Sequence, residues 1–141
     1  METSCYGSLK KVREFFRYRL TFWEHLSDRP PAHMKTIHSR KGRNALRKLG
    51  ELLELEEVKV SYIPSDSDVG TLTLIGMKGG KGIYVSISSP PSFGSEWQRD
   101  ILYRTVKDME DYFGGCNQFL RTQDFVNDPE GSLAAMKRLL S

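Results

Sequence analysis

The chain has 141 residues, enough for one domain that buries a core without disulfide or metal staples. Two cysteines are too few for a disulfide framework, and no apolar run approaches the length of a membrane-spanning helix. Because residues 1–30 also carry charges where a signal peptide needs an apolar core, composition argues against secreted and integral membrane proteins and leads us to expect a cytoplasmic one.

The net charge of +3 conceals a strong asymmetry along the chain. Residues 1–48 hold 12 Lys or Arg against 4 Asp or Glu, whereas residues 49–141 hold 9 against 14. Such a split suggests that the basic segment binds an anionic surface, either nucleic acid or an acidic patch on a protein. The alternative is that the acidic part of the same chain neutralises the basic part.

Residues 8–26 are predicted to form an amphipathic helix, with Ser8 as a possible N-cap. Its apolar positions recur at spacings of three and four: Leu9, Val12, Phe16, Leu20 and Trp23. Beside this face runs a basic stripe, Lys10, Arg13 and Arg17. The helix is therefore expected to bury one side and to present a basic edge.

Two features of this helix allow more than one interpretation. Arg19 falls inside the apolar arc, where an arginine either pairs with a buried acid or contacts an external anion. The aromatic residues Phe15, Phe16, Tyr18, Phe22 and Trp23 could stack on bases, but at helical spacing such residues usually form a core. They could also pair with a second copy of the helix.

Pro30 and Pro31 are expected to end the first helix and to begin a linker that runs to residue 38. The linker region contains Lys35 among three histidines, His25, His33 and His38. A metal site would need these histidines to converge with carboxylates or thiolates, and the surrounding positive charge disfavours a cation. No metal site is predicted, and Lys35 is grouped with the basic residues that could contact phosphates.

A second helix is predicted from Ser39, a candidate N-cap, to about Leu55. Its charges oppose the helix dipole, because the bases gather in the first half and the acids in the second. The bases are Arg40, Lys41, Arg43, Arg47 and Lys48. The three arginines share the face opposite the leucines, which suits contacts along a phosphate backbone, although a solvated charged face explains the same pattern.

Three strands are predicted next. Residues 57–63 alternate apolar and polar side chains, and residues 69–88 form a β-hairpin whose turn is Lys78-Gly79-Gly80-Lys81. The inward side chains would be Val58, Val60, Tyr62, Leu72, Leu74, Ile83, Val85 and Ile87. The outward side chains would be Lys59, Ser61, Thr71, Thr73, Tyr84, Ser86 and Ser88, a small and polar set suited to water.

The last third of the chain is predicted to be helical in two places. A capping box at Ser95–Gln98 would open a helix that carries Trp97, Ile101 and Val106 on one face, ends at Gly114-Gly115 and covers the sheet. Residues 116–127 would be irregular. Asp128-Pro129-Glu130 has the form of an N-cap and first turn, so a short final helix should follow.

No catalytic or cofactor site is predicted. The glycine-rich sequence between Lys78 and Gly82 joins two strands, whereas a phosphate-binding loop opens a helix after a strand. Glu57 and Lys59 have the Glu-x-Lys spacing of metal-dependent nucleases, but the chain lacks an aspartate on an earlier strand to complete the metal site. We therefore expect a protein that is not an enzyme and holds no metal or other cofactor.

Together these elements predict an α+β fold, a three-stranded antiparallel β-meander with helices packed on one face in the order α-α-β-β-β-α-α. A single domain over residues 1–141 would comprise a basic helix and linker at 1–38, a core at 39–113 and a C-terminal extension at 114–141.

The sequence leaves two functional hypotheses. The first is a small non-enzymatic module that contacts nucleic acid, mainly through phosphates, with its basic N-terminal helices. The second is a protein-interaction module, an inhibitor or adaptor, that docks on an acidic partner or forms a homo-oligomer through its first helix; neither involves a membrane. The candidate contact residues are Lys10, Arg13, Arg17, Lys35, Arg40, Lys41, Arg43, Arg47 and Lys48, with Lys78 and Lys81 as secondary contacts.

Overall fold

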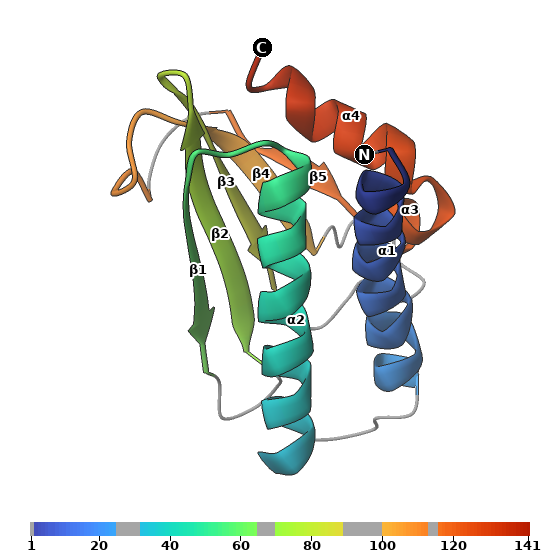
Figure 1. Ribbon diagram of the computed structural model, residues 1–141. Coiled ribbons are helices and arrows are strands. Elements are labelled where there is room, and N and C mark those ends of the chain that lie inside the picture. The colour runs from blue at the N-terminus through green and yellow to red at the C-terminus, as the bar shows by residue number, and fades with distance from the viewer. Residues whose placement is uncertain (1, 25–31, 65–69, 89–99, 113–115) are drawn as a thin grey trace.

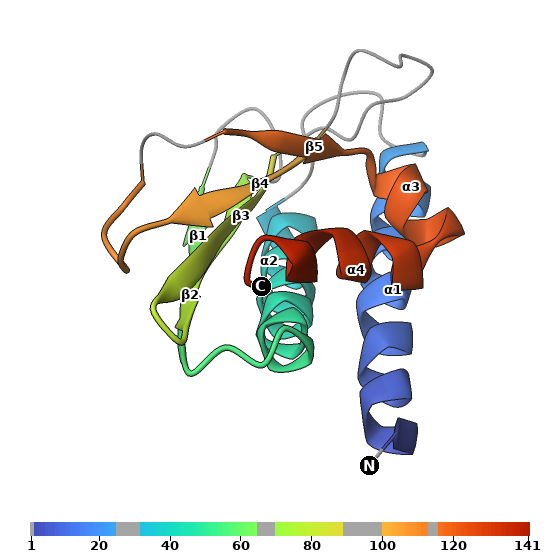
Figure 2. The ribbon, with the colours of Figure 1, turned by 90° about the horizontal axis from the view of Figure 1, so that it is seen from above.

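The computed structural model describes residues 2–24, 32–64, 70–88, 100–112 and 116–141, and within the first helix it describes the side chains of residues 7–21. The helices are α1 (Glu2–Glu24), α2 (Ala32–Leu52), α3 (Thr122–Asn127) and α4 (Pro129–Arg138). The strands are β1 (Glu57–Ile63), β2 (Thr71–Lys78), β3 (Lys81–Ile87), β4 (Ile101–Val106) and β5 (Gln118–Leu120). The helices lie on one side of the sheet (Figures 1 and 2), so the α+β class with one-sided helices is confirmed.

The sheet is an antiparallel meander in the order β1-β2-β3-β4-β5, so the described residues form five strands where three were predicted. The three predicted strands are confirmed, and their register places Val60 opposite Leu74 and Leu74 opposite Val85. A two-residue turn joins β2 to β3, with Gly79 at φ 55° and Gly80 at φ 82°. Both glycines have the positive φ that a type I′ hairpin turn needs, which is why this turn could be predicted.

The helix predicted from residue 95 to 113 is wrong over its central part, because Ile101–Val106 forms β4 beside β3. Ile101 and Tyr103 face the core as alternate residues of a strand, and Val85 lies opposite Tyr103. Ile101, Tyr103, Thr105 and Val106 are of the β-branched and aromatic types that suit strands. The proposed capping box at 95–98 and the glycine stop at 114–115 lie outside the described residues.

Residues 116–127, predicted to be irregular, contain β5 and α3. Phe125 of α3 is fully buried, and its ring centroid lies 4.6 Å from that of Phe16 in α1. The predicted final helix is confirmed as α4: the side chain of Asp128 accepts a hydrogen bond from the backbone N–H of Gly131, and Pro129 occupies the first turn.

Both N-terminal helices extend beyond their predicted starts. α1 begins at Glu2 rather than Ser8, and α2 begins at Ala32, so the linker predicted to reach residue 38 is wrong from residue 32 onward. Ser39 is a buried residue inside α2 rather than its N-cap. Residues 32–38 contain no proline or glycine that would interrupt a helix, and tertiary burial of His38 favours helix there. None of the helices in the described part of the chain is long and apolar enough to cross a membrane.

The core lies between the sheet and the helices. Most of the predicted inward residues are fully buried there: Leu72, Leu74, Ile83, Val85 and Ile87. Val60 and Tyr62 are half-buried against the core, but Val58 on β1 is 41% exposed, contrary to prediction. The outer face is less exposed to water than predicted, because Thr73 and Ile75 at its centre are buried.

α2 approaches the sheet closely at two glycines and contacts both β1 and β2. A Cβ atom at Gly42 would collide with the Leu72 side chain and lie 3.0 Å from Cζ of Phe15. A Cβ at Gly50 would lie 3.3 Å from Cγ2 of Val58. These close approaches fix the level of α2 along the strands, with residue 42 near Leu72 and residue 50 near Val58.

Candidate functional site

α1 and α2 lie side by side and antiparallel, and they present most of the basic side chains (Figure 1). Within residues 7–21 and 32–52 there are 11 Lys or Arg and two acids, Glu14 and Glu51. Their apolar faces pack inward through residues such as Val12, Leu46 and Leu49. The solvent-facing sides of the two helices therefore form one positively charged surface, which we call the basic surface.

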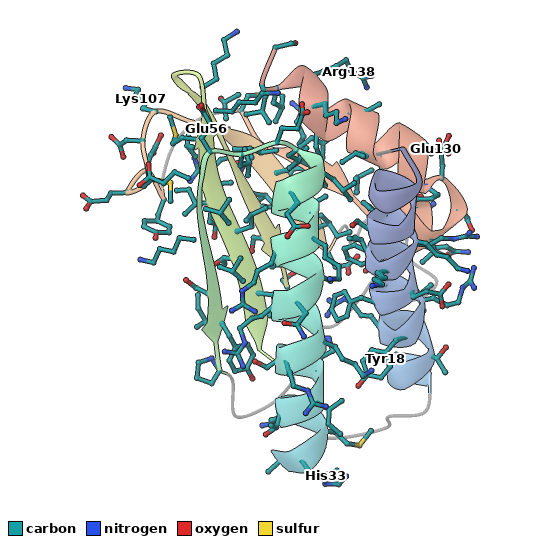
Figure 3. All side chains as sticks on the ribbon, in the orientation of Figure 1. Tyr18, His33, Glu56, Lys107, Glu130 and Arg138 are labelled. Carbon is teal, nitrogen blue, oxygen red and sulfur yellow. The ribbon has the colours of Figure 1, made fainter. Side chains whose placement is uncertain are left out.

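A groove runs along the basic surface between the two helices; we call it the helix groove. It is lined by Lys11, Glu14, Phe15, Tyr18, Lys41, Asn44, Ala45 and Lys48. Lys41 and Lys48 are two helical turns apart, and so are Lys11 and Tyr18 on the facing helix. Since the helices are antiparallel, Lys11 and Lys48 lie toward one end of the groove and Lys41 and Tyr18 toward the other (Figures 1 and 3).

The Lys41 Nζ atom lies 5.3 Å from the centroid of the Tyr18 ring, a distance at which a cation is attracted to the π face. Burial raises the pKa of the Tyr18 hydroxyl above its ordinary value, so the ring remains neutral at physiological pH. This end of the helix groove thus combines an exposed ammonium group with a half-buried aromatic ring.

The predicted contact residues of α1 occupy different positions. Lys10 is exposed, whereas Nε of Arg13 donates to the carbonyl oxygen of Val126 at 3.0 Å and so ties α1 to α3. Arg17 pairs with Glu14 at 3.3 Å, with both side chains about half exposed. Lys10 and Arg13 also line a shallow depression with Glu130, whose carboxylate lowers the local positive potential. None of the three lines the helix groove.

The predicted contact residues of α2 spread around its outward side. Lys41 and Lys48 face the helix groove, and Arg40 is exposed. Arg47 donates to Oδ1 of Asn44 at 3.1 Å and faces β1, whereas Arg43 is half-buried. The three arginines therefore do not form one fully exposed face as predicted. Lys35, near the start of α2, is half-buried.

The two secondary candidates, Lys78 and Lys81, are separate from this surface. Both lie at the turn between β2 and β3 and are engaged within the chain. Lys78 pairs with Glu54 at 3.0 Å, which lowers the pKa of the Glu54 carboxyl, and Lys81 donates to the carbonyl oxygen of Ser141. These bonds give the two lysines local structural partners.

Arg19 adopts the first of its two interpretations, a buried pair with an acid. Its side chain is fully buried and pairs with Asp100 at 3.2 Å. It also donates to the hydroxyl of Thr122, to His38 Nε2 and to the carbonyl oxygen of Ser88. Asp100 in turn accepts from the backbone N–H of Thr122 at 2.9 Å and from its hydroxyl.

This buried polar cluster (Arg19, His38, Asp100 and Thr122), which also bonds the carbonyl oxygen of the exposed Ser88, joins both N-terminal helices to α3 and to the residue before β4. Because a guanidinium group can only donate, His38 Nε2 must accept from it. Burial, with a smaller effect from the Arg19 charge, lowers the pKa of His38 to about 3. His38 is therefore neutral at physiological pH and acts as a structural acceptor.

The aromatic residues described in α1 belong mainly to the core. Phe15 and Phe16 are buried, with their ring centroids 5.4 Å apart, and Tyr18 is half-buried. Tyr18 is the most exposed of these described rings, and both Tyr18 and Phe15 line the helix groove. The side chains of Phe22 and Trp23 lie outside the described residues.

Within the described part of the chain, the acids that follow α2 are not paired with the lysines of the helix groove. Among the described residues, one ion pair joins these helices to a later acid, the buried Arg19–Asp100 pair. Lys41 and Lys48 form no ion pair within the described ranges. Direct pairing with the acidic part therefore does not neutralise the helix groove.

Metal-ligating residues do not converge within the described residues, where no group of three or more His, Cys, Asp or Glu side chains could hold a metal ion. His33 is exposed at the start of α2, as Figure 3 shows, while His38 belongs to the buried cluster. His25 lies outside the described residues. Cys116 is an exposed free thiol.

Sequence reasoning did not single out three polar residues of the helix groove, Lys11, Glu14 and Asn44, and it placed Tyr18 in an aromatic set expected mainly to form a core. The repeat of seven between Lys11 and Tyr18, matched by that between Lys41 and Lys48, is visible in the sequence and places each pair on one side of its helix. What the sequence did not indicate is that these two sides face each other.

Comparisons of the chain with protein-family models, with curated proteins and with solved structures found no match.

Proposed function

We propose that the protein is a nucleic-acid-binding module that contacts phosphates through the basic surface, with the helix groove at its centre. The observation that carries the proposal is the set of three lysines, Lys11, Lys41 and Lys48, which line one groove with a single acid, Glu14. Their ammonium groups come from two helices that the buried cluster and the core hold together. Such a fixed array favours a polyanion over a single anion.

The dimensions of the helix groove suit a phosphate backbone. Lys41 and Lys48 are seven residues apart on α2, which corresponds to about 10 Å along the helix axis. One strand of a duplex places a phosphate about every 3.4 Å along its axis, so the groove would span about three phosphates. Arg40 and Lys10 on the adjoining solvent-facing sides would extend the contact, which depends on charge rather than on base sequence.

Direct binding measurements test this proposal. The purified chain would be titrated against fluorescently labelled duplex DNA, single-stranded DNA and RNA of equal length, with polyglutamate as a non-nucleic polyanion. We expect the nucleic acids to bind at low salt and to resist competition by an equal charge concentration of polyglutamate. Absence of binding at low salt would refute the proposal, and a preference for polyglutamate would instead support the acidic-protein hypothesis.

A pair of variants localises the contact. Lys41→Gln with Lys48→Gln removes two charges from the helix groove, and Lys59→Gln with Lys107→Gln removes two exposed charges elsewhere, on β1 and after β4. Loss of the groove lysines should weaken binding at least tenfold more than loss of the control lysines. Equal weakening by both pairs would show that overall charge, rather than the helix groove, governs binding.

A further inference from the structure

The strand β1 forms one edge of the sheet and pairs with β2 alone, so one side of its backbone has no neighbouring strand within the described residues (Figure 1). It is seven residues long, which corresponds to about 24 Å of edge. Two of its apolar side chains are unusually exposed, Val58 at 41% and Ile63 at 57%. A long edge with exposed apolar side chains is a template for pairing with another strand.

A second groove lies next to this edge, between α2 and β1; we call it the edge groove. Its lining residues are Arg47, Gly50, Glu51, Leu55, Val58 and Val60. Leu55, Val58 and Val60 contribute apolar side chains to it, and α2 contributes one base and one acid. A strand added to β1 would direct every second side chain into this groove.

The charges of α2 supply a third observation. Arg47 and Glu51 line the edge groove, and helical spacing puts Arg43, four residues before Arg47, on the same side of α2, so the bases lie toward the N-terminus and the acid toward the C-terminus. This order is unfavourable with respect to the dipole of a single helix. Two such helices placed antiparallel, however, bring the basic half of each opposite the acidic half of the other.

We propose that the β1 edge and the edge groove bind a second copy of this chain, forming a twofold-symmetric dimer in which the two β1 strands pair antiparallel. Pairing centred on Val60 uses all seven residues of each strand, since Glu57 then lies opposite Ile63 and Val58 opposite Tyr62 of the other copy. In this register the two Val60 side chains meet on the inner face. Lys59 lies opposite Ser61, so the two lysines are not directly paired.

The same symmetry places the two α2 helices antiparallel over the joined sheet. α2 contacts both β1 and β2, so it lies over the line between these two strands. In the joined sheet the two α2 helices would therefore be separated by about two strand spacings, roughly 10 Å, which is a normal helix packing distance. Gly42 lies near the level of Tyr62, which pairs with Leu72, and Gly50 lies near Val58. The level of Val60 therefore corresponds to about residue 46 of α2.

At that level Arg43 of one copy comes within about two residues, or ~3 Å along the axis, of Glu51 of the other copy. The twofold axis produces this pairing twice. The exposed Val58 side chains and the Leu55 side chains would then be covered between the helices and the joined strands. One arrangement thus accounts for the edge position of β1, the edge groove and the reversed charges of α2, and it does not depend on nucleic acid.

Sedimentation velocity of the full chain, from low micromolar to several hundred micromolar concentration and without nucleic acid, tests this proposal. We expect a concentration-dependent species of twice the 16.2 kDa chain mass. Arg43→Glu and Glu51→Arg should each weaken the dimer at least tenfold, because each places like charges together at two symmetric positions. Thermal unfolding of each variant would verify that it is folded.

A mixing experiment provides the decisive control. Arg43→Glu and Glu51→Arg chains, each weakly associating alone, should form a heterodimer when combined, because both interchain pairs are then of opposite sign. The double variant R43E/E51R should also dimerise. Since residues 43 and 51 lie eight apart on one helix, outside the range of neighbouring side chains, an effect within one chain would not produce this rescue.

A strictly monomeric wild-type chain over the whole concentration range would overturn the proposal. So would a dimer that both single variants leave unchanged, or single variants that lose association and do not recover it when mixed. The nucleic-acid proposal would be unaffected by any of these results, because its binding measurements do not require a dimer.

Discussion

The buried His38 side chain makes the pH dependence of stability a quantitative test of the fold. Its pKa falls from an ordinary value of 6.5 to about 3 in the native state, because burial and the Arg19 charge disfavour the protonated ring. Below pH 6.5 the unfolded chain binds a proton at His38, whereas the native chain does not do so until the pH approaches 3. The contribution of His38 to the free energy of unfolding is therefore complete above pH 6.5, and it declines as the pH falls from 6.5 toward about 3.

The magnitude follows from the linkage between proton binding and folding. Each pH unit inside the window lowers the free energy of unfolding by about 1.4 kcal/mol, so a fall from about pH 6.5 to about pH 4.5 costs about 2.7 kcal/mol. Other groups also titrate there, so the measured quantity is a difference between two chains. His38→Gln retains an acceptor for Arg19 but removes the titration.

Urea denaturation at about pH 7.5 and about pH 4.5 would measure this difference. We expect the wild-type chain to lose about 2–3 kcal/mol more than the His38→Gln chain on acidification. His33→Gln, at the exposed His33 side chain, is the matched control and should behave as wild type. If the wild-type and His38→Gln chains lost the same free energy, His38 would not be held neutral by burial and the described cluster would be wrong.

Three further substitutions test the packing and the cap. Asp100→Asn leaves the buried Arg19 guanidinium without a counter-charge and should cost about 3–5 kcal/mol in urea denaturation; a loss below about 1 kcal/mol would contradict a buried pair. Gly42→Ala should lower the melting temperature, because crowding against Leu72 destabilises the fold by about 1–3 kcal/mol whereas the better helix propensity of alanine stabilises it by about 1 kcal/mol. A higher melting temperature would refute the close approach. Asp128→Ala removes the α4 cap and should cost about 1 kcal/mol, whereas Asp128→Asn should retain most of it, and equal melting of both variants would argue against capping.

The sheet was the most predictable part of the fold, and its first three strands occur where the sequence places them. Their positions follow from local rules, because alternation sets the faces and two glycines with positive φ set the turn. β4 was missed for a physical reason. The spacing of Ile101, Leu102 and Val106 satisfies a helical period as well as a strand, and only pairing with β3 decides between them.

Tertiary contacts also explain the errors at the helix ends and at the sheet edge. The extra turns of α2 include His38, which is buried against Arg19, a residue 19 positions away in the sequence. Val58 has the correct parity for the core but lies on an edge strand with nothing beyond it in the described residues, so it remains exposed. Alternation predicts the face of a residue and not its distance from the centre of the sheet.

The candidate site was predictable in its charge and not in its geometry. The excess of bases in residues 1–48 correctly indicated that the first two helices carry the positive surface. Some of these basic side chains line the helix groove, some contact α3 and some face β1. Which of them lie in each place depends on how α1 and α2 pack against each other. Helical periodicity supplies the faces of each helix but not the angle at which two helices meet.

The salt dependence of nucleic-acid affinity is the most direct measure of whether the helix groove binds phosphates. For the wild-type chain, the logarithm of the association constant should fall linearly with the logarithm of salt concentration between about 50 and 200 mM. Replacing both Lys41 and Lys48 with glutamine should make that slope shallower by about 1.4 to 1.8, because each lost phosphate contact removes about 0.7 to 0.9. An affinity indifferent to salt, or a variant slope equal to that of the wild-type chain, would contradict the proposed function.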